Sequence, residues 1–114
     1  MPKKALSPLT EPMYYVLLCF HRKEMSGNEI TSMVEDMTAG RVRMGPGTLY
    51  TILSTFLSEK LIEKTGSEGR RIFYRITERG EKMYMEEVAR LRKCLADADK
   101  ADTEKEYVSH EESM

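Results

Sequence analysis

Apolar positions in the first quarter of the chain repeat with helical spacing. Between residues 9 and 23 they share one face of a predicted helix, and Thr10 or Ser7 is placed to cap it. Further apolar side chains lie beside that face, so this helix must be covered on two sides. The pattern therefore predicts a second packing partner for the helix, such as another subunit. The main apolar face consists of Met13, Val16, Leu17 and Phe20.

Two further helices follow, each with a start signal. Ser26 and Glu29 form a capping-box pair at the start of the second helix, and Gly40 is placed to end it. Pro46 suits the first turn of the third helix. The apolar face of the second helix consists of Ile30, Met33, Val34 and Met37. The third helix carries a fuller stripe, made of Leu49, Ile52, Leu53, Phe56 and Leu57.

The opposite face of the third predicted helix carries hydroxyl groups and no charge. A solvent-facing side of a helix more often carries Glu and Lys. Gly45 and Gly47 flank the proline at its start, and Arg41 and Arg43 come just before them. The side chains of this face are Thr48, Tyr50, Thr51, Ser54, Thr55 and Ser58.

Residues 61–66 and 71–77 alternate between apolar and polar positions and are rich in β-branched and aromatic residues, which predicts a β-hairpin. The residues around its tip are basic: Lys64, Arg70 and Arg71. Within the second strand, we expect Phe73 to fill the core and Tyr74 to pack across the strands.

A last helix is predicted to begin after Thr77, which can cap it. Its apolar residues repeat at spacings of four, three and four, which is typical of a coiled-coil seam about two heptads long. Beyond Asp97 the chain is acidic and lacks apolar periodicity, so we expect a disordered tail. The seam consists of Tyr84, Val88, Leu91 and Leu95.

Together these elements predict a mainly α fold with a small β-hairpin (α+β), namely a winged helix-turn-helix followed by a C-terminal dimerisation helix. We expect a flexible basic arm over residues 1–8 and the winged helix-turn-helix over 9–77. The dimerisation helix is expected over 78–97 and the acidic tail over 98–114.

The distribution of charged residues along the chain is more informative about function than the net charge. The 114 residues suit one domain, and their formal net charge is only −1. Residues 41–82, however, carry nine Lys and Arg against five acids, whereas residues 97–114 carry two Lys against seven acids. The local field of a basic body, rather than the net charge, steers a polyanion. No apolar run is long enough to span a bilayer, and we expect a cytoplasmic protein with no membrane partner.

In a winged helix-turn-helix the third helix enters the major groove of DNA. Its N-terminal N–H groups favour a phosphate, and the two glycines remove side chains that would hold a DNA backbone at a distance. Short hydroxyl side chains can meet base edges or phosphates, and basic residues supply the salt-dependent contact with the backbone. The expected DNA-binding residues are Lys4, Arg41, Arg43, Gly47, Thr48, Tyr50, Thr51, Ser54, Lys64, Arg70 and Arg71.

The segments LTEPMYYVLLCF, MSGNEI, GPGTLYTIL and LIEKTGSEGRRIFYRITERG occur in this order. In sequence and spacing the chain resembles the PadR family of transcriptional regulators, in its short single-domain form, over residues 9–95. The resemblance implies a two-fold symmetric homodimer that binds a palindromic operator in double-stranded DNA and represses transcription. It also implies that the last helix pairs with the first helix of the other subunit. The residues assigned to this dimer interface are Tyr14, Leu18, Tyr84, Val88, Leu91 and Leu95.

The chain departs from the family pattern at two points that matter below. Lys60 occupies a position before the hairpin where relatives usually have Gly, which suits a left-handed backbone. Some relatives bind flat drugs between their last helices with a Trp; this chain has no Trp, and Tyr84 is only a loose substitute.

The sequence also bears on three other functions. An enzyme is disfavoured because no candidate nucleophile has a His–acid pair at a suitable spacing, and GPGTLY lacks the lysine and preceding strand of a P-loop. We therefore assign no catalytic residue, no metal ligand and no cofactor. A winged-helix module for protein–protein contact is the main alternative, and it predicts no salt-dependent DNA affinity. A small-molecule effector that relieves repression is a further hypothesis that extends the repressor function.

Overall fold

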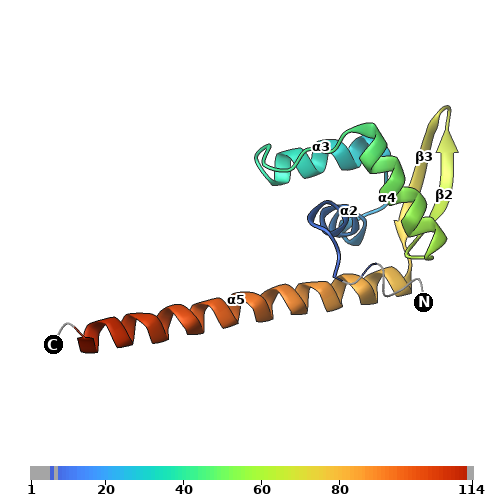
Figure 1. Cartoon of the computed structure of the whole chain (residues 1–114). Coiled ribbons are helices and arrows are strands. Elements are labelled where there is room, and N and C mark those ends of the chain that lie inside the picture. Colours follow the sequence, from blue (N-terminus) through green and yellow to red (C-terminus); the bar gives the residue numbers. More distant parts are fainter. Residues whose placement is uncertain (1–5, 7, 113–114) are drawn as a thin grey trace.

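The computed structural model describes residue 6 and residues 8–112, with side chains described up to residue 104. Within this part of the chain, four helices accompany a three-stranded antiparallel sheet with the strand order β1–β3–β2. Figure 1 labels the helices and the two longer strands. The expected winged helix with a C-terminal helix is confirmed. The elements are α2 (Glu11–Arg22), β1 (Met25–Ser26), α3 (Gly27–Met37), α4 (Pro46–Ser58), β2 (Ile62–Glu68), β3 (Arg71–Ile76) and α5 (Glu78–Glu112).

Helix α2 lies at the centre of the fold and packs against α3, β3 and α5. The backbone N–H of Met13 donates a hydrogen bond to Oγ1 of Thr10 at 3.3 Å, so Thr10 is the cap; Ser7 lies outside the described residues. Within the chain, α5 supplies a second packing surface for this helix. Its coverage by another subunit stays a prediction. The fully buried side chains of α2 are Val16, Leu17, Cys19 and Phe20.

Helix α3 begins and ends with polar backbone contacts. The carboxylate of Glu29 accepts a hydrogen bond from the backbone N–H of Ser26 at 2.8 Å, and this bond lowers the pKa of Glu29. The helix ends with Ala39 and Gly40 in the left-handed region, at φ 52° and 79°. Met37 in the last turn is 37% exposed, so its expected place in the core is wrong; the helix has already left the core there.

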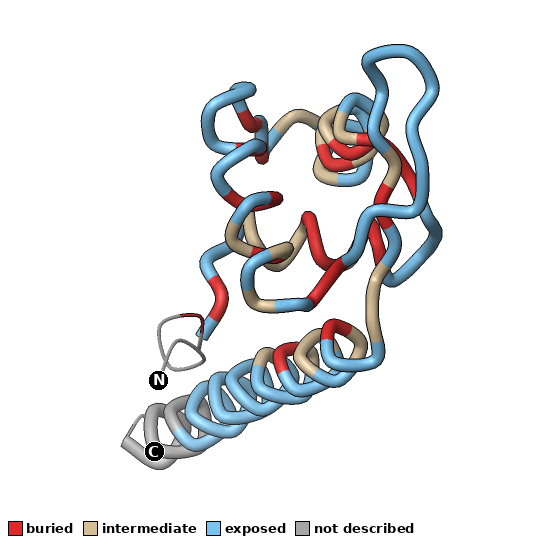
Figure 2. The backbone as a smooth tube through the Cα atoms, turned by 90° about the vertical axis from the view of Figure 1, so that its right-hand side faces the viewer, coloured by how far each residue is buried: buried red, intermediate tan, exposed pale blue. Residues whose placement is uncertain are grey.

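The hairpin projects from the body, and only Ile62 of β2 is buried (Figure 2). Strand β1 is a third strand that the sequence pattern missed, because two residues are too few to show alternation; it pairs Met25 with Tyr74. Tyr74 is buried and packs edge-on against Phe20 with ring centroids 6.0 Å apart, whereas Phe73 is half-buried. The roles expected for these two aromatic residues were thus reversed, because the Tyr74 face of β3 is the one that packs on α2.

The C-terminal part of helix α5 extends away from the rest of the chain (Figure 1). Its backbone is helical from residue 98 to residue 112, so the expectation of a disordered tail is wrong over that range. The reason is that residues 81–114 contain no Gly or Pro and are rich in Ala, Glu and Lys, which favour helix even without an apolar face. Every side chain from Arg92 to Glu104 is exposed.

The start of α5 is tightly joined to the start of the wing. Thr77 donates its hydroxyl to the carbonyl of Lys60 at 2.7 Å and its backbone N–H to the carbonyl of Leu61 at 3.0 Å. It also accepts a bond from the N–H of Gly80 at 3.1 Å, which confirms it as the helix cap. A Cβ added to Gly80 would lie 2.1 Å from the Leu61 carbonyl oxygen and 2.6 Å from Cγ1 of Ile76. Only glycine lets the two segments approach this closely.

Replacing Lys60 by glycine should stabilise the protein. Lys60 has φ 61°, a left-handed conformation in which a side chain is strained, and its own side chain is exposed. We expect Lys60→Gly to raise the free energy of unfolding by about 1 kcal/mol in denaturant titrations. Lys60→Ala is the matched control, since it removes the same charge but keeps the strain. Equal stability of the two variants would contradict the explanation.

Replacing Gly80 by alanine should have the opposite effect. Because the new methyl group would meet backbone, α5 must shift, and we expect Gly80→Ala to lose about 3 kcal/mol of stability. Gly66→Ala serves as the control, since a Cβ at Gly66 meets nothing within 4 Å. A thermal melt that shows similar Tm values for the two variants would show that the contact is easily relaxed.

Candidate nucleic-acid interface

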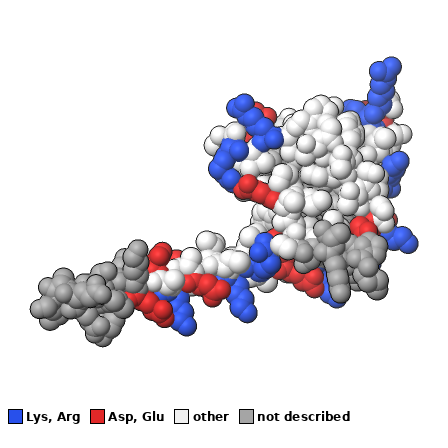
Figure 3. All heavy atoms as spheres, in the orientation of Figure 1, with Lys and Arg blue, Asp and Glu red and all other residues white. Residues whose placement is uncertain are grey.

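The outer face of α4 is exposed and uncharged. Its inner stripe is buried as predicted, except that Leu57 is half-buried. Tyr50 is 60% exposed, and α4 contains no acidic residue. Figure 3 shows a broad white surface over this helix, with basic side chains projecting towards the wing on one side and the α3–α4 connection on the other. The exposed hydroxyl side chains are Thr48, Tyr50, Thr51, Ser54 and Ser58.

The first turn of α4 presents two glycines that the fold itself does not require. A Cβ added to Gly45 or to Gly47 would meet nothing within 4 Å, and neither residue has a positive φ. Both are exposed. Their missing side chains leave the N–H groups at this helix end open to an external surface, and such N–H groups favour anions.

The three basic residues expected at the wing differ in their contacts. Lys64 and Arg70 are exposed. Arg71 instead donates a hydrogen bond to Oγ of Ser26 at 3.2 Å, lies 3.9 Å from a carboxylate oxygen of Glu29, and packs over the ring of Phe73. Arg71 therefore also joins the wing to the start of α3.

A hollow of about 220 Å³ lies between the wing, the start of α3 and α4. Two arginines, a phenol and an amide are thus close together, and all of them can donate hydrogen bonds to a phosphate. Sequence reasoning missed Asn28; its signal was its place in the first turn of α3, where backbone N–H groups lack helical partners. The polar residues that line the hollow are Ser26, Asn28, Tyr50, Arg70 and Arg71.

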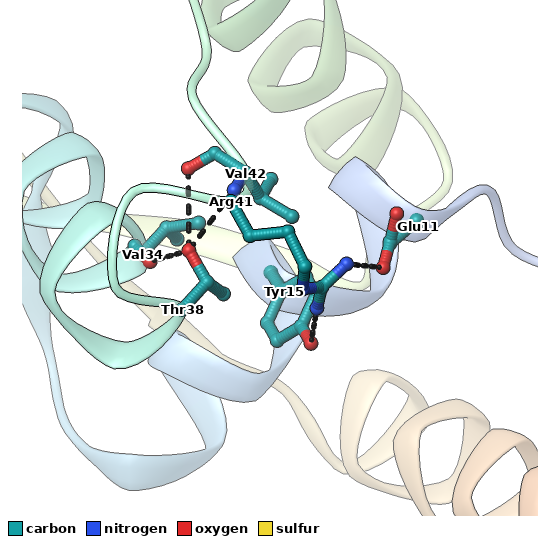
Figure 4. Close-up of polar contacts among 6 residues, drawn as sticks. All are labelled: Glu11, Tyr15, Val34, Thr38, Arg41 and Val42. Atoms are coloured by element: carbon teal, nitrogen blue, oxygen red, sulfur yellow. Dashed lines mark hydrogen bonds and ion pairs between the residues drawn. The ribbon is translucent and has the colours of Figure 1, made fainter.

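The two arginines before α4 are placed differently from one another. Arg41 donates hydrogen bonds from its two terminal nitrogens to Oε2 of Glu11 at 2.7 Å and to the hydroxyl of Tyr15 at 2.8 Å (Figure 4). The bond to Glu11 raises the pKa of Arg41. Arg43 is 73% exposed and lies 3.6 Å from Glu35. Lys4 lies outside the described residues.

The residues expected at a dimer interface line a second surface, a groove of about 870 Å³ between α2 and α5. Tyr14 and Tyr84 stack within the chain with centroids 6.1 Å apart, and burial together with Tyr84 raises the pKa of Tyr14. Val88 and Leu91 are half-buried, and Leu95 is 66% exposed. Leu18 is half-buried and does not line the groove.

Two close side-chain pairs lie in this region. The buried carboxylate of Glu87 accepts hydrogen bonds from Arg90 at 2.6 and 3.1 Å. His21 stacks on Tyr84 with ring centroids 4.1 Å apart, and its Nδ1 lies 2.9 Å from Glu81. The contact of His21 with Glu81 joins the first turn of α5 to α2, whereas Glu87 and Arg90 both belong to α5.

Comparison with known proteins shows which family the chain belongs to. The sequence profile of the transcriptional regulator PadR-like family matches residues 16–86, which is more than half of the chain. The chain belongs to the PadR-like family. It is therefore a transcriptional regulator by family, and within the part that the structure describes no helix is long and apolar enough to cross a membrane.

Solved structures share the fold of this PadR-like chain at low sequence identity. A transcriptional regulator from Clostridium thermocellum has a TM-score of 0.71 and 23% identity, over 78% of this chain and 87% of that one. RosR from H. salinarum has a TM-score of 0.68 and 22% identity, over 95% and 97%. A PadR-like transcription factor from Bacteroides fragilis has a TM-score of 0.67 and 21% identity, over 76% and 85%. No curated protein matches the chain significantly.

Proposed function

We propose that this PadR-like regulator is a homodimeric repressor that acts in the cytoplasm and binds a palindromic operator in double-stranded DNA. In this proposal α4 enters the major groove and the wing contacts the neighbouring backbone. The observation that carries it is the outer face of α4, which is exposed, hydroxylated and uncharged, and begins at two glycines that nothing in the fold requires. A face with these properties suits close approach to base edges and phosphates.

Contacts with phosphates would come from the edges of that face. Arg43, Lys64 and Arg70 are exposed and basic, and the hollow beside Tyr50 offers several hydrogen-bond donors in one place. Lys4 in the N-terminal arm is proposed to add a further backbone contact. Such contacts make affinity fall steeply with salt, because each neutralised phosphate releases counterions.

The groove between α2 and α5 supports the dimer. Its apolar seam runs from Tyr84 to Leu95 and stays partly open to solvent, and the far half of α5 packs on nothing within the described chain. We propose that the seam of a second copy covers it, as in a coiled coil. An effector that relieves repression is proposed to enter the same groove, where the stacked pair Tyr14 and Tyr84 suits a flat apolar molecule.

The first test is binding to a labelled duplex taken from upstream of the protein's own coding sequence. We expect selective binding that weakens steeply between low and physiological salt. In Gly47→Ala the new methyl group faces outward, so affinity should fall at least about tenfold, equivalent to one ordinary hydrogen bond lost in each protomer. The Tm should be unchanged or higher, because alanine favours helix more than glycine.

In Gly47→Ala we expect DNA affinity to fall while the Tm stays the same or rises. A variant that binds less DNA because it is unfolded would instead show a lower Tm. Unchanged affinity in this variant would remove α4 from the interface. If no duplex is bound selectively at low salt, the protein–protein module becomes the better explanation of the exposed face.

Replacing Leu91 by aspartate should break the dimer. The seam would have to bury a carboxylate without a partner, which is costly. Light scattering coupled to gel filtration should show a dimer for the wild type and a monomer for Leu91→Asp, with helical content retained in circular dichroism. The matched control is Ala89→Asp, since Ala89 is exposed and does not line the groove. A dimeric Leu91→Asp would place the interface elsewhere.

A further inference from the structure

Arg41 uses both of its terminal nitrogens inside the protein. One nitrogen lies 2.7 Å from Oε2 of Glu11, and the other lies 2.8 Å from the hydroxyl of Tyr15 (Figure 4). Both acceptors belong to α2, one helical turn apart, so the two bonds fix the guanidinium in direction as well as position. Two of its five N–H donors are thus already directed to α2.

The connection that carries Arg41 leads directly to the first turn of α4. Its beginning is fixed by Thr38, which donates its hydroxyl to the carbonyl of Val34 at 2.8 Å and accepts a bond from the N–H of Val42 at 3.1 Å (Figure 4). Val42 and Met44 are buried and anchor its middle. These contacts set the path of the chain from α3 up to the exposed glycines.

The entry to α4 has little packing of its own. Gly45 and Gly47 are exposed, and nothing lies within 4 Å of the side-chain position of either residue. Glycines also leave the backbone free to take many conformations. Leu49 anchors α4 in the core, and just before the helix Arg41 adds hydrogen bonds that reach α2.

We propose that Arg41 is a positioning residue rather than a DNA ligand. Through Glu11 and Tyr15 it holds the α3–α4 connection against α2 and so sets the position of the first turn of α4. This changes the role that the sequence led us to expect for Arg41, and it rests on the proposed function, because the turn that it positions is the one proposed to contact DNA.

The sign of one substitution separates the two roles. Removing the acid in Glu11→Ala would raise DNA affinity if Arg41 bound a phosphate, because a competing negative charge would be gone. A positioning role predicts the reverse. On the same upstream duplex we expect Glu11→Ala and Tyr15→Phe each to weaken binding by about 3- to 10-fold, as fits the loss of exposed contacts in both protomers.

The salt dependence and the combined variants give further readouts. We expect Arg41→Ala to weaken binding by a similar factor with an unchanged salt slope, whereas loss of a phosphate ligand would lower the slope by about 2 per dimer. Arg41→Ala with Glu11→Ala should be no worse than either alone, because both remove the same contact. The swapped pair Glu11→Arg with Arg41→Glu should regain affinity.

The matched control is Glu35→Ala. Glu35 lies 3.6 Å from the exposed Arg43, for which a direct phosphate contact is still proposed. Its removal should leave DNA affinity unchanged or raise it. If Glu11→Ala behaves like Glu35→Ala, or if Arg41→Ala lowers the salt slope, Arg41 is a phosphate ligand and the inference is wrong.

A measurement on the free protein keeps this test separate from the proposed function. Hydrogen exchange of the backbone amides of residues 41–45 and 47 should be several-fold faster in Glu11→Ala and Tyr15→Phe than in the wild type or Glu35→Ala. Unchanged exchange in all variants overturns the positioning role whether or not DNA is bound. Faster exchange in a protein whose wild type binds no duplex would instead overturn the DNA-binding proposal alone.

Discussion

The fold depends on a close contact between the start of the last helix and the start of the wing. Gly80 lies against the Leu61 carbonyl at a distance that no other residue could tolerate, and Thr77 bonds to Lys60 and Leu61 beside it. This junction turns the chain out of the sheet and directs α5 across α2. The groove, the stacked tyrosines and the coverage of α2 all follow from that direction.

The same junction explains a departure from the family pattern. A left-handed residue is needed at position 60 to end α4 and start the wing, and this chain supplies Lys60 at φ 61°. The strain is tolerated because the backbone there is held by the bond from Thr77, while the Lys60 side chain stays in solvent. The helix, the wing and the last helix thus share one local arrangement of a few residues.

Local signals predicted most of the fold. The stripe of α4, the capping pair Ser26 and Glu29, and the cap Thr77 depend on spacings of a few residues, and the structure confirms them. The features that the sequence analysis missed or predicted wrongly do not depend on such short spacings of apolar and capping residues. Strand β1 exists only through its pairing with β3, and the helical state of residues 98–112 follows from propensity without any apolar pattern to reveal it.

The candidate site likewise has features that the sequence predicts and features that it does not. The exposed face of α4 and its open glycines could be predicted, because helical spacing alone separates them from the buried stripe. The partners of the arginines could not. Arg41 bonds to residues about 30 positions earlier in the chain, and Arg71 bonds to Ser26, 45 positions earlier. The sequence alone does not show which arginines are free to bind DNA. In the folded chain these two arginines already make hydrogen bonds to other side chains.

The length of α5 has a mechanical consequence. Its 35 residues span roughly 52 Å at the usual rise of an α-helix, yet no side chain from Arg92 to Glu104 is covered by the body. The helix is therefore anchored near Gly80 at one end, and its other end is not held by the body. A tilt of about 5° at Gly80 moves the far end of α5 by roughly 4 Å, whereas the stacked rings of Tyr14 and Tyr84 shift by only a fraction of that distance. Small changes in packing at the tyrosines thus become large displacements at the other end of the molecule.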